Sequence, residues 1–176
     1  MRAVNSIASM TSDGIIGRAT NDTFGFPDAW DYPEDLLRFK ELTQRQGVLM
    51  GRKTFFSIPK ENRPLKNRFN IVASRQEKKL FSAENYLQVL DAEKFVVDFL
   101  ESKIDLGFDT LWVIGGREIY QATLHLCNNL FLTVVKGKHD GNVYFPDFKD
   151  LFVEDFSARI QSDSCTYHIY RSKNLA

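Results

Sequence analysis

Cysteine and histidine are scarce in this chain of 176 residues, which has two cysteines and three histidines. Cys127 and Cys165 do not have the spacing of metal ligands, and the histidines are scattered, so we predict no metal site. Two distant cysteines also argue against a disulfide scaffold and indicate a reduced, intracellular protein. We expect each thiol to have a structural role.

The chain also lacks an excess of either charge and any long apolar run. It has 23 basic and 23 acidic residues, so its formal net charge is zero and no long-range field favours nucleic acid or an anionic membrane. Any anion site must therefore be local. The N-terminus has no signal-peptide pattern, and no segment approaches the length of a membrane span. These absences predict a soluble, cytoplasmic protein, and we expect it to be a monomer.

The length fits one domain, residues 1–176, that buries roughly two thirds of its unfolded surface. Strand-like and helix-like segments alternate, which indicates an α/β fold with a mostly parallel sheet, about four helices and an antiparallel C-terminal strand. The expected strands are 3–10, 47–50, 68–74, 86–90, 110–114, 130–136, 153–160 and 166–171, the last two forming a hairpin. The expected helices are 31–43, a short one after 51–54, 92–102 and 117–126.

The segment from Trp30 to Thr43 reads as a helix with a clear start. Asp31 is a suitable N-cap and Pro33 is tolerated in the first turn. Asp35 stands four residues before Phe39, so it borders the apolar stripe of the helix. A carboxylate there is costly unless something pairs with it, and that partner can be a ligand. The alternative is that Asp35 only complements the helix dipole.

Basic residues follow two neighbouring strands. Arg52 comes directly after Gly51, and Ser74 and Arg75 end the strand 68–74. If the strands are parallel neighbours, these groups converge at the ligand edge of the sheet and suit a dianion. The alternative is an ordinary solvated surface. The pair Gly115–Gly116 follows another strand and permits a close backbone approach to a ligand, although a plain tight turn is the default.

The order of these motifs resembles the dihydrofolate reductase family over nearly the whole chain. The matching residues are Trp30, Pro33, Asp35, Leu36, Phe39, Lys40, Thr43, Gly51 to Thr54, Arg63 to Leu65, Arg68, Ser74, Arg75, Ile114 to Gly116, Tyr120, Thr133 and Tyr144 to Pro146. The resemblance implies an eight-stranded sheet and NADPH-dependent reduction of dihydrofolate, with hydride transfer to C6 and protonation of N5 through water.

The resemblance also implies a set of site residues. Asp35, Trp30 and Thr133 are the implied catalytic residues. Those implied to bind substrate are Ile7, Ala8, Asp35, Leu36, Phe39, Ile58, Leu65, Arg68, Ile114 and Tyr120. Those implied to bind NADPH are Ala8, Ile16, Gly17, Gly51, Arg52, Lys53, Thr54, Ser74, Arg75, Ile114, Gly115, Gly116 and Tyr120. Leu36, Ile58 and Leu65 could instead be ordinary core residues.

The chain departs from the family pattern in three places. The polar run 18–29, expected to be a surface loop, is longer than in compact relatives, so 20–27 receive no assignment. Arg117 stands where the family often has glycine, and Asn142 where many relatives have an acid. Two other functions remain open: a related NADPH-dependent pyrimidine reductase of riboflavin synthesis, and a non-catalytic pterin or nucleotide binder.

Overall fold

The computed structural model describes residues 1–27, 30–76 and 78–175. Its main sheet contains β1 (Ala3–Thr11), β4 (Gly47–Gly51), β5 (Phe69–Ala73), β6 (Tyr86–Val89), β7 (Thr110–Val113), β8 (Asn129–Val135), β10 (Phe152–Glu154), β11 (Ile160–Gln161) and β12 (Cys165–Ser172). A small second sheet is formed by β2 (Ile15–Ala19), β3 (Phe24–Gly25) and β9 (Val143–Tyr144). The helices are α1 (Pro33–Thr43), α2 (Arg52–Ser57), α3 (Ala92–Leu100) and α4 (Arg117–Thr123), with short 3-10 turns at Lys60–Asn62, Leu124–Leu126, Phe156–Ala158 and Lys173–Leu175.

The main sheet has the order β10-β12-β8-β1-β7-β4-β5-β6, with β11 also paired to β12. Every neighbouring pair from β8 to β6 is parallel, whereas β12 runs antiparallel to β8. The predicted α/β class, with a mostly parallel sheet, an antiparallel C-terminal strand and four helices, is therefore confirmed.

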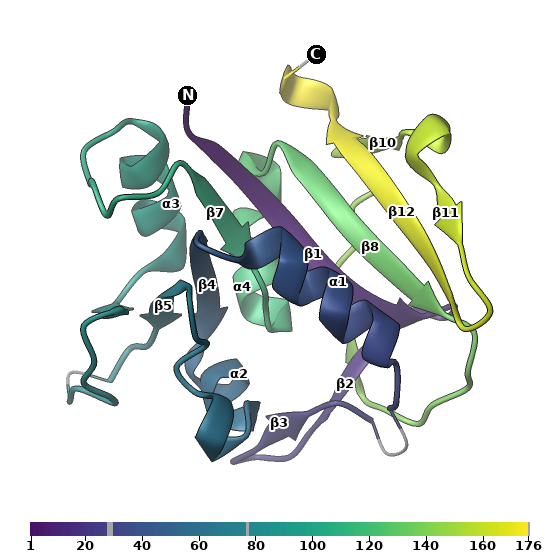
Figure 1. Cartoon of the computed structure of the whole chain (residues 1–176), viewed down its shortest axis with the longest axis horizontal. Coiled ribbons are helices and arrows are strands. Elements are labelled where there is room, and N and C mark those ends of the chain that lie inside the picture. The colour runs from purple at the N-terminus through teal and green to yellow at the C-terminus, as the bar shows by residue number, and fades with distance from the viewer. Residues whose placement is uncertain (28–29, 77, 176) are drawn as a thin grey trace.

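Helices cover both faces of this sheet. α1 crosses one face in front of β1, and α3 and α4 lie behind (Figure 1). Side chains of β4 alternate accordingly: Val48 and Met50 pack with Phe39 of α1, and Leu49 packs with Phe99 of α3. No helix among the described residues combines the length and apolar character needed to cross a bilayer. Both cysteines are free and buried, as expected for structural thiols.

The N-cap prediction for α1 was wrong. The cap position is Tyr32 rather than Asp31, and no side chain caps the helix there, although Pro33 does occupy the first turn. The acid that anchors this end is Glu34, whose carboxylate accepts hydrogen bonds from Ser162 and Ser164. A contact across the fold thus replaces the local cap, which the local sequence could not show.

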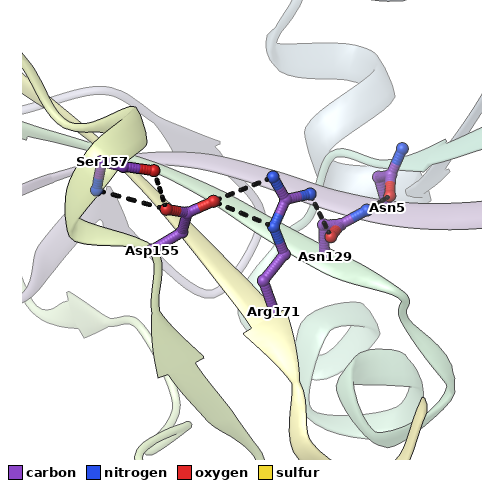
Figure 2. A network of polar contacts seen from close by, with 5 residues as sticks. All are labelled: Asn5, Asn129, Asp155, Ser157 and Arg171. Carbon is purple, nitrogen blue, oxygen red and sulfur yellow. Dashed lines mark hydrogen bonds and ion pairs between the residues drawn. The ribbon is translucent and has the colours of Figure 1, made fainter. Parts of the chain in front are cut away.

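The first strand of the predicted C-terminal hairpin is interrupted. Asp155 caps a 3-10 turn by accepting hydrogen bonds from the backbone nitrogen and hydroxyl of Ser157, at 3.2 and 2.6 Å. Its other oxygen pairs with Arg171 at 3.0 Å. Arg171 also donates a hydrogen bond to the side chain of Asn129, which in turn donates one to Asn5 (Figure 2). The continuous strand 153–160 is therefore replaced by β10, this turn and β11, both strands pairing with β12.

Part of the predicted surface loop 18–29 is a strand pair. Arg18 and Ala19 end β2, and Phe24–Gly25 pair with them as β3 beside α2 (Figure 1). Residues 28 and 29 of that prediction lie outside the described residues.

The loop that leads into β5 is held by one buried side chain. Asn70, fully buried, accepts from the backbone nitrogen of Leu65 at 2.8 Å and donates to the carbonyls of Leu65 and Arg68 at 3.0 and 3.1 Å. The side chain satisfies three backbone groups that no neighbouring strand reaches.

We expect Asn70→Ala to lower the free energy of unfolding by roughly 2 kcal/mol, because it removes three hydrogen bonds and leaves the part-buried backbone nitrogen and carbonyl of Leu65 without them. Asn85→Ala is the matched control, since Asn85 donates a single bond to the Arg68 carbonyl. Urea denaturation measures both, and equal losses for the two variants would contradict this account of the loop.

Candidate active site

A cavity of about 750 Å³ opens at the carboxyl ends of β1, β4 and β7, beside α1. This is the edge at which open α/β sheets bind ligands. Its walls are Ile7, Ala8, Ser9, Ile16, Phe24, Phe26, Asp35, Leu36, Phe39, Lys40, Thr54, Ser57, Ile58, Pro59, Asn62, Leu65, Lys66, Asn67, Arg68, Ile114, Gly116 and Tyr120. The walls are largely apolar, with a few polar groups, as is typical of a site for a flat organic ligand.

All ten residues that were predicted to bind substrate line this cavity. Leu36 is 55% exposed although it is apolar, because it faces the cavity rather than the core. The core alternative is therefore wrong for Leu36. Ile58 and Leu65 are half-buried and belong to both environments, since they also pack against the core between α1 and the sheet.

Asp35 is a half-buried carboxylate in the first turn of α1. Burial raises its pKa above the ordinary range for aspartate, while the hydroxyls of Thr133 and Ser9 and the charge of Arg38 act in the opposite direction. Desolvation dominates, so the ionised form is held at a cost. A half-buried carboxylate in an apolar cavity, with a raised pKa, has the properties of a functional group rather than of a helix-dipole charge.

Tyr120 fixes the wall opposite α1. Its buried hydroxyl donates a hydrogen bond of 2.7 Å to the carbonyl of Ile7. A β-carbon added to Gly115, whose φ is +105°, would meet the Tyr120 ring at 3.0 Å. The tyrosine thus requires glycine just after β7, and the Gly115–Gly116 peptide is cis.

Arg68 places a cation in the cavity wall without an acidic partner. Its guanidinium donates to the hydroxyl of Thr43 at 3.2 Å and to the carbonyl of Lys66 at 3.0 Å, and lies 5.7 Å from the ring centre of Phe39. Burial lowers its pKa. Among the described residues no carboxylate pairs with Arg68, so its charge is available to an anionic ligand.

The predicted NADPH residues divide into two groups. Six line the cavity: Ala8, Ile16, Thr54, Ile114, Gly116 and Tyr120. The others, Gly17, Gly51, Arg52, Lys53, Ser74, Arg75 and Gly115, are not in its wall. Gly51 is in register with Ala73 of the parallel strand β5, so Arg52 and Ser74 follow at adjacent strand ends as expected.

One feature of this edge suits an extended ligand. A β-carbon on Gly116 would lie 3.3 Å from the hydroxyl of Thr54, so glycine keeps that side of the cavity open. Lys53, in contrast, is not in the cavity wall, and its ammonium group donates a hydrogen bond to the backbone carbonyl of Asn21 at 3.0 Å. Gly17 is required by packing, because an added β-carbon would overlap the Phe24 ring at 2.4 Å.

Two of the three predicted catalytic residues do not line the cavity. Trp30 stacks on Phe26 with ring centres 5.3 Å apart and lies 4.8 Å from His139. Thr133 is buried in β8 and acts on the Asp35 carboxylate from beneath. Of the three, only Asp35 lies in the wall.

Several wall residues were missed by the sequence analysis: Ser9, Phe24, Phe26, Lys40, Ser57, Pro59, Asn62, Lys66 and Asn67. Phe24 and Phe26 come from the unassigned stretch 20–27. The only available signal was the presence of two large aromatic side chains in a polar, turn-rich segment.

The two unusual residues make local links. Arg117 donates to the carbonyl of Tyr144 at 2.7 Å and so joins α4 to β9. The Asn142 side chain accepts from the backbone nitrogen of Ala19 at 2.8 Å and donates to its carbonyl at 2.9 Å. An amide can make both bonds, whereas a carboxylate could make only the first.

The raised pKa of Asp35 predicts how stability depends on pH. Ionised Asp35 disfavours the folded state above the ordinary aspartate range, and this cost disappears when the carboxyl is protonated in both states. We expect ligand-free Asp35→Asn to melt above the wild type near about pH 8, with the difference vanishing near about pH 3.

Glu34→Gln provides the opposite case. Hydrogen bonds from Ser164 and Ser162 lower the pKa of Glu34, so its stabilising contribution is present above the ordinary glutamate range and is lost in acid. This variant should melt below the wild type at neutral pH. Calorimetry of both variants across pH measures the two trends, and the same trend in both would refute the assignment for Asp35.

Comparison with known proteins gives a consistent result. A family model described as dihydrofolate reductase matches residues 3–175. The dihydrofolate reductase of Mycobacterium leprae is 37% identical over 156 residues, covering 87% of this chain and 86% of that protein. The chicken (Gallus gallus) dihydrofolate reductase is 33% identical over 159 residues, covering 85% and 82%.

A solved dihydrofolate reductase from Enterococcus faecalis has the same fold. It superposes with a TM-score of 0.77 over 97% of this chain and 96% of that one, at 22% identity. The family model and the sequence relatives therefore agree with the fold and with the cavity at the strand ends. The chain belongs to the dihydrofolate reductase family.

Proposed function

We propose that this protein reduces 7,8-dihydrofolate to tetrahydrofolate with NADPH. The observation that carries the proposal is Asp35, a desolvated carboxylate in an apolar cavity at the strand ends of a chain that belongs to this family. The structurally similar Enterococcus faecalis enzyme was solved with NADP(H), which supports the cofactor. The ligands are therefore small molecules. The zero net charge and the lack of a long apolar run favour a cytoplasmic protein that does not bind nucleic acid, and we propose a monomer.

The residues at the strand ends fit a dinucleotide phosphate. Ile16, Thr54, Ile114 and Gly116 would border the nicotinamide end in the cavity. Arg52, Ser74 and Arg75, at adjacent strand ends, would hold a terminal phosphate by charge-assisted hydrogen bonds. The cofactor, when bound, supplies the hydride. The protein must then orient two rings, exclude water and stabilise the developing positive charge.

Asp35 performs the last of these tasks in the proposed reaction. Its two oxygens accept hydrogen bonds from N3–H and the 2-amino group of the pterin, which fixes the ring in one orientation. The negative charge also stabilises the pterin as N5 becomes protonated. No other acid side chain is in the cavity wall among the described residues, so we propose that the proton reaches N5 through water.

Arg68 extends recognition beyond the pterin. Its unpaired guanidinium lies in the same cavity as Asp35 and would bind the α-carboxylate of the glutamate tail. A substrate with a hydrogen-bonding ring at one end and an anion at the other requires both residues. A pyrimidine reductase of riboflavin synthesis would not need them together, so their presence in one cavity favours the folate substrate.

The direct test is NADPH oxidation with dihydrofolate as the only acceptor. Turnover excludes a non-catalytic binder. An absence of turnover in the folded protein would overturn the proposal, and activity only with a pyrimidine substrate would favour the riboflavin-pathway alternative.

For Asp35→Asn we expect a decrease in kcat of roughly two to three orders of magnitude, as for loss of one preorganised electrostatic group. The deficit should shrink as the pH falls, because substrate that is already protonated needs less stabilisation. Single-turnover hydride transfer against pH measures both effects. Glu41→Gln, at an exposed position of the same helix outside the cavity wall, should keep near-normal kcat. A folded Asp35→Asn that is as active as the wild type would end the assignment.

For Arg68→Leu we expect kcat/KM for dihydrofolate to fall by a factor of roughly ten to one hundred, because a charge-assisted hydrogen bond is lost. A dihydropterin that lacks the glutamate tail should lose little. Arg45→Leu, at an exposed position near Arg68 but outside the cavity wall, is the control and should change neither substrate. Equal losses for both substrates would show that Arg68 does not recognise the tail.

A further inference from the structure

Arg38 is a half-buried cation that the proposed reaction does not use. It lies on α1, three residues after Asp35, and its guanidinium carbon is 4.7 Å from the ring centre of Tyr167 and 5.9 Å from that of Phe131. The side chain therefore points under the helix toward β12 and β8 rather than into the cavity.

This environment offers the Arg38 guanidinium few hydrogen-bond or ion-pair partners. The Nη1 atom is buried and has no hydrogen-bond partner among the described residues, and no carboxylate there lies within ion-pair distance. Burial accordingly lowers the pKa of Arg38. Aromatic faces recover part of the lost solvation of a guanidinium, but less than a paired carboxylate would. An apolar side chain of the same length would avoid the cost altogether.

The main anionic group that acts on Arg38 is Asp35, one helical turn away. The charge of Asp35 favours the protonated guanidinium, and the charge of Arg38 favours the ionised carboxylate. The two groups interact without a direct ion pair, so the Arg38 guanidinium does not occupy the Asp35 oxygens. Charges in a buried environment are poorly screened by salt, which makes such an interaction effective over this spacing.

We propose that Arg38 is a positioning residue for the reaction: held on Tyr167 and Phe131 beneath α1, one turn from Asp35, its cation supports the negative charge of the carboxylate that receives the substrate. The inference rests on the proposed function, because an ionised Asp35 is the form that accepts both hydrogen bonds from a pterin. It assigns a role to a guanidinium that contacts neither substrate nor cofactor.

The other groups around Asp35 do not replace this charge. Thr133 of β8 and Ser9 of β1 offer neutral hydroxyls, and Glu34 on the same helix acts in the opposite direction. Three titratable groups from other elements, Tyr120 of α4 and Cys165 and Tyr167 of β12, have pKa values raised by burial and stay neutral where aspartate titrates. Arg38 is thus the cation that acts on Asp35 from within the described residues.

The test compares wild type with Arg38→Met, Arg38→Lys and Arg159→Met. Methionine keeps the length and fits between aromatic rings without charge, and lysine restores the charge. Arg159 is the matched control because it also lies over an aromatic ring, 4.9 Å from the centre of Phe156, but in the C-terminal turn. If Arg38→Met does not fold, Arg38→Gln provides the same loss of charge.

The first measurement is the titration of the Asp35 carboxyl by carbon-13 NMR in the ligand-free protein, which requires no turnover. We expect Asp35 to titrate at higher pH in Arg38→Met, and close to the wild-type value in Arg38→Lys and Arg159→Met. Unchanged titration in Arg38→Met would overturn the proposal. An equal shift in Arg159→Met would also overturn it, by showing a general effect of net charge.

The second measurement is dihydrofolate affinity against pH, followed by tryptophan fluorescence. The loss of affinity in Arg38→Met should be smallest at neutral pH and grow as the pH falls through the titration of Asp35. A loss that is independent of pH would indicate a merely structural role and overturn the proposal. If the wild type neither binds nor reduces dihydrofolate, the proposed function fails, while the NMR titration still decides the effect of Arg38 on Asp35.

Discussion

The site depends on a carboxylate kept out of water. Asp35 is placed in the first turn of α1, and α1 lies across the sheet so that this turn reaches the carboxyl end of β1 (Figure 1). Desolvation raises the free energy of its ionised form, and the surrounding hydroxyls and the Arg38 cation offset only part of that cost. A ligand that donates two hydrogen bonds can offset much of the remainder. The same burial that makes Asp35 unfavourable in the empty protein therefore makes it a strong recognition group.

The sheet supplies the walls against which this carboxylate works. Parallel strands β1, β4 and β7 end at one edge, so short segments that are distant in the sequence meet there. The Tyr120 hydroxyl ties the wall to the Ile7 carbonyl, and its ring requires glycine at position 115. Glu34 anchors the other side of the site, because its bonds to Ser162 and Ser164 hold the start of α1 against the β11–β12 turn. The helix end thus depends on the C-terminal hairpin.

The sequence analysis succeeded where the signal was periodic or carried by the family motifs. Each long strand was found within a few residues. The ten residues proposed to bind substrate line one cavity, and their role in binding stays a prediction. It failed where local rules competed with distant contacts. Asp31 had the chemistry of an N-cap, but Glu34 instead found partners far along the chain. The predicted strand 153–160 is interrupted at Asp155, because its carboxylate accepts a hydrogen bond from Ser157 and pairs with Arg171. The pairing with Arg171 is not visible in the local sequence.

The sequence by itself determined the alternation of strands and helices, the glycines at the strand ends and the identity of the groups available for chemistry. Hydrophobic period and turn chemistry are local properties, so a single chain suffices to read them. Only the tertiary structure decided which polar groups are desolvated and what faces them. It placed Leu36, Phe24 and Phe26 in a cavity wall, and it placed the guanidinium of Arg38 over the rings of Tyr167 and Phe131. Burial and electrostatic coupling depend on segments far apart in the chain, which is why no local pattern could reveal them.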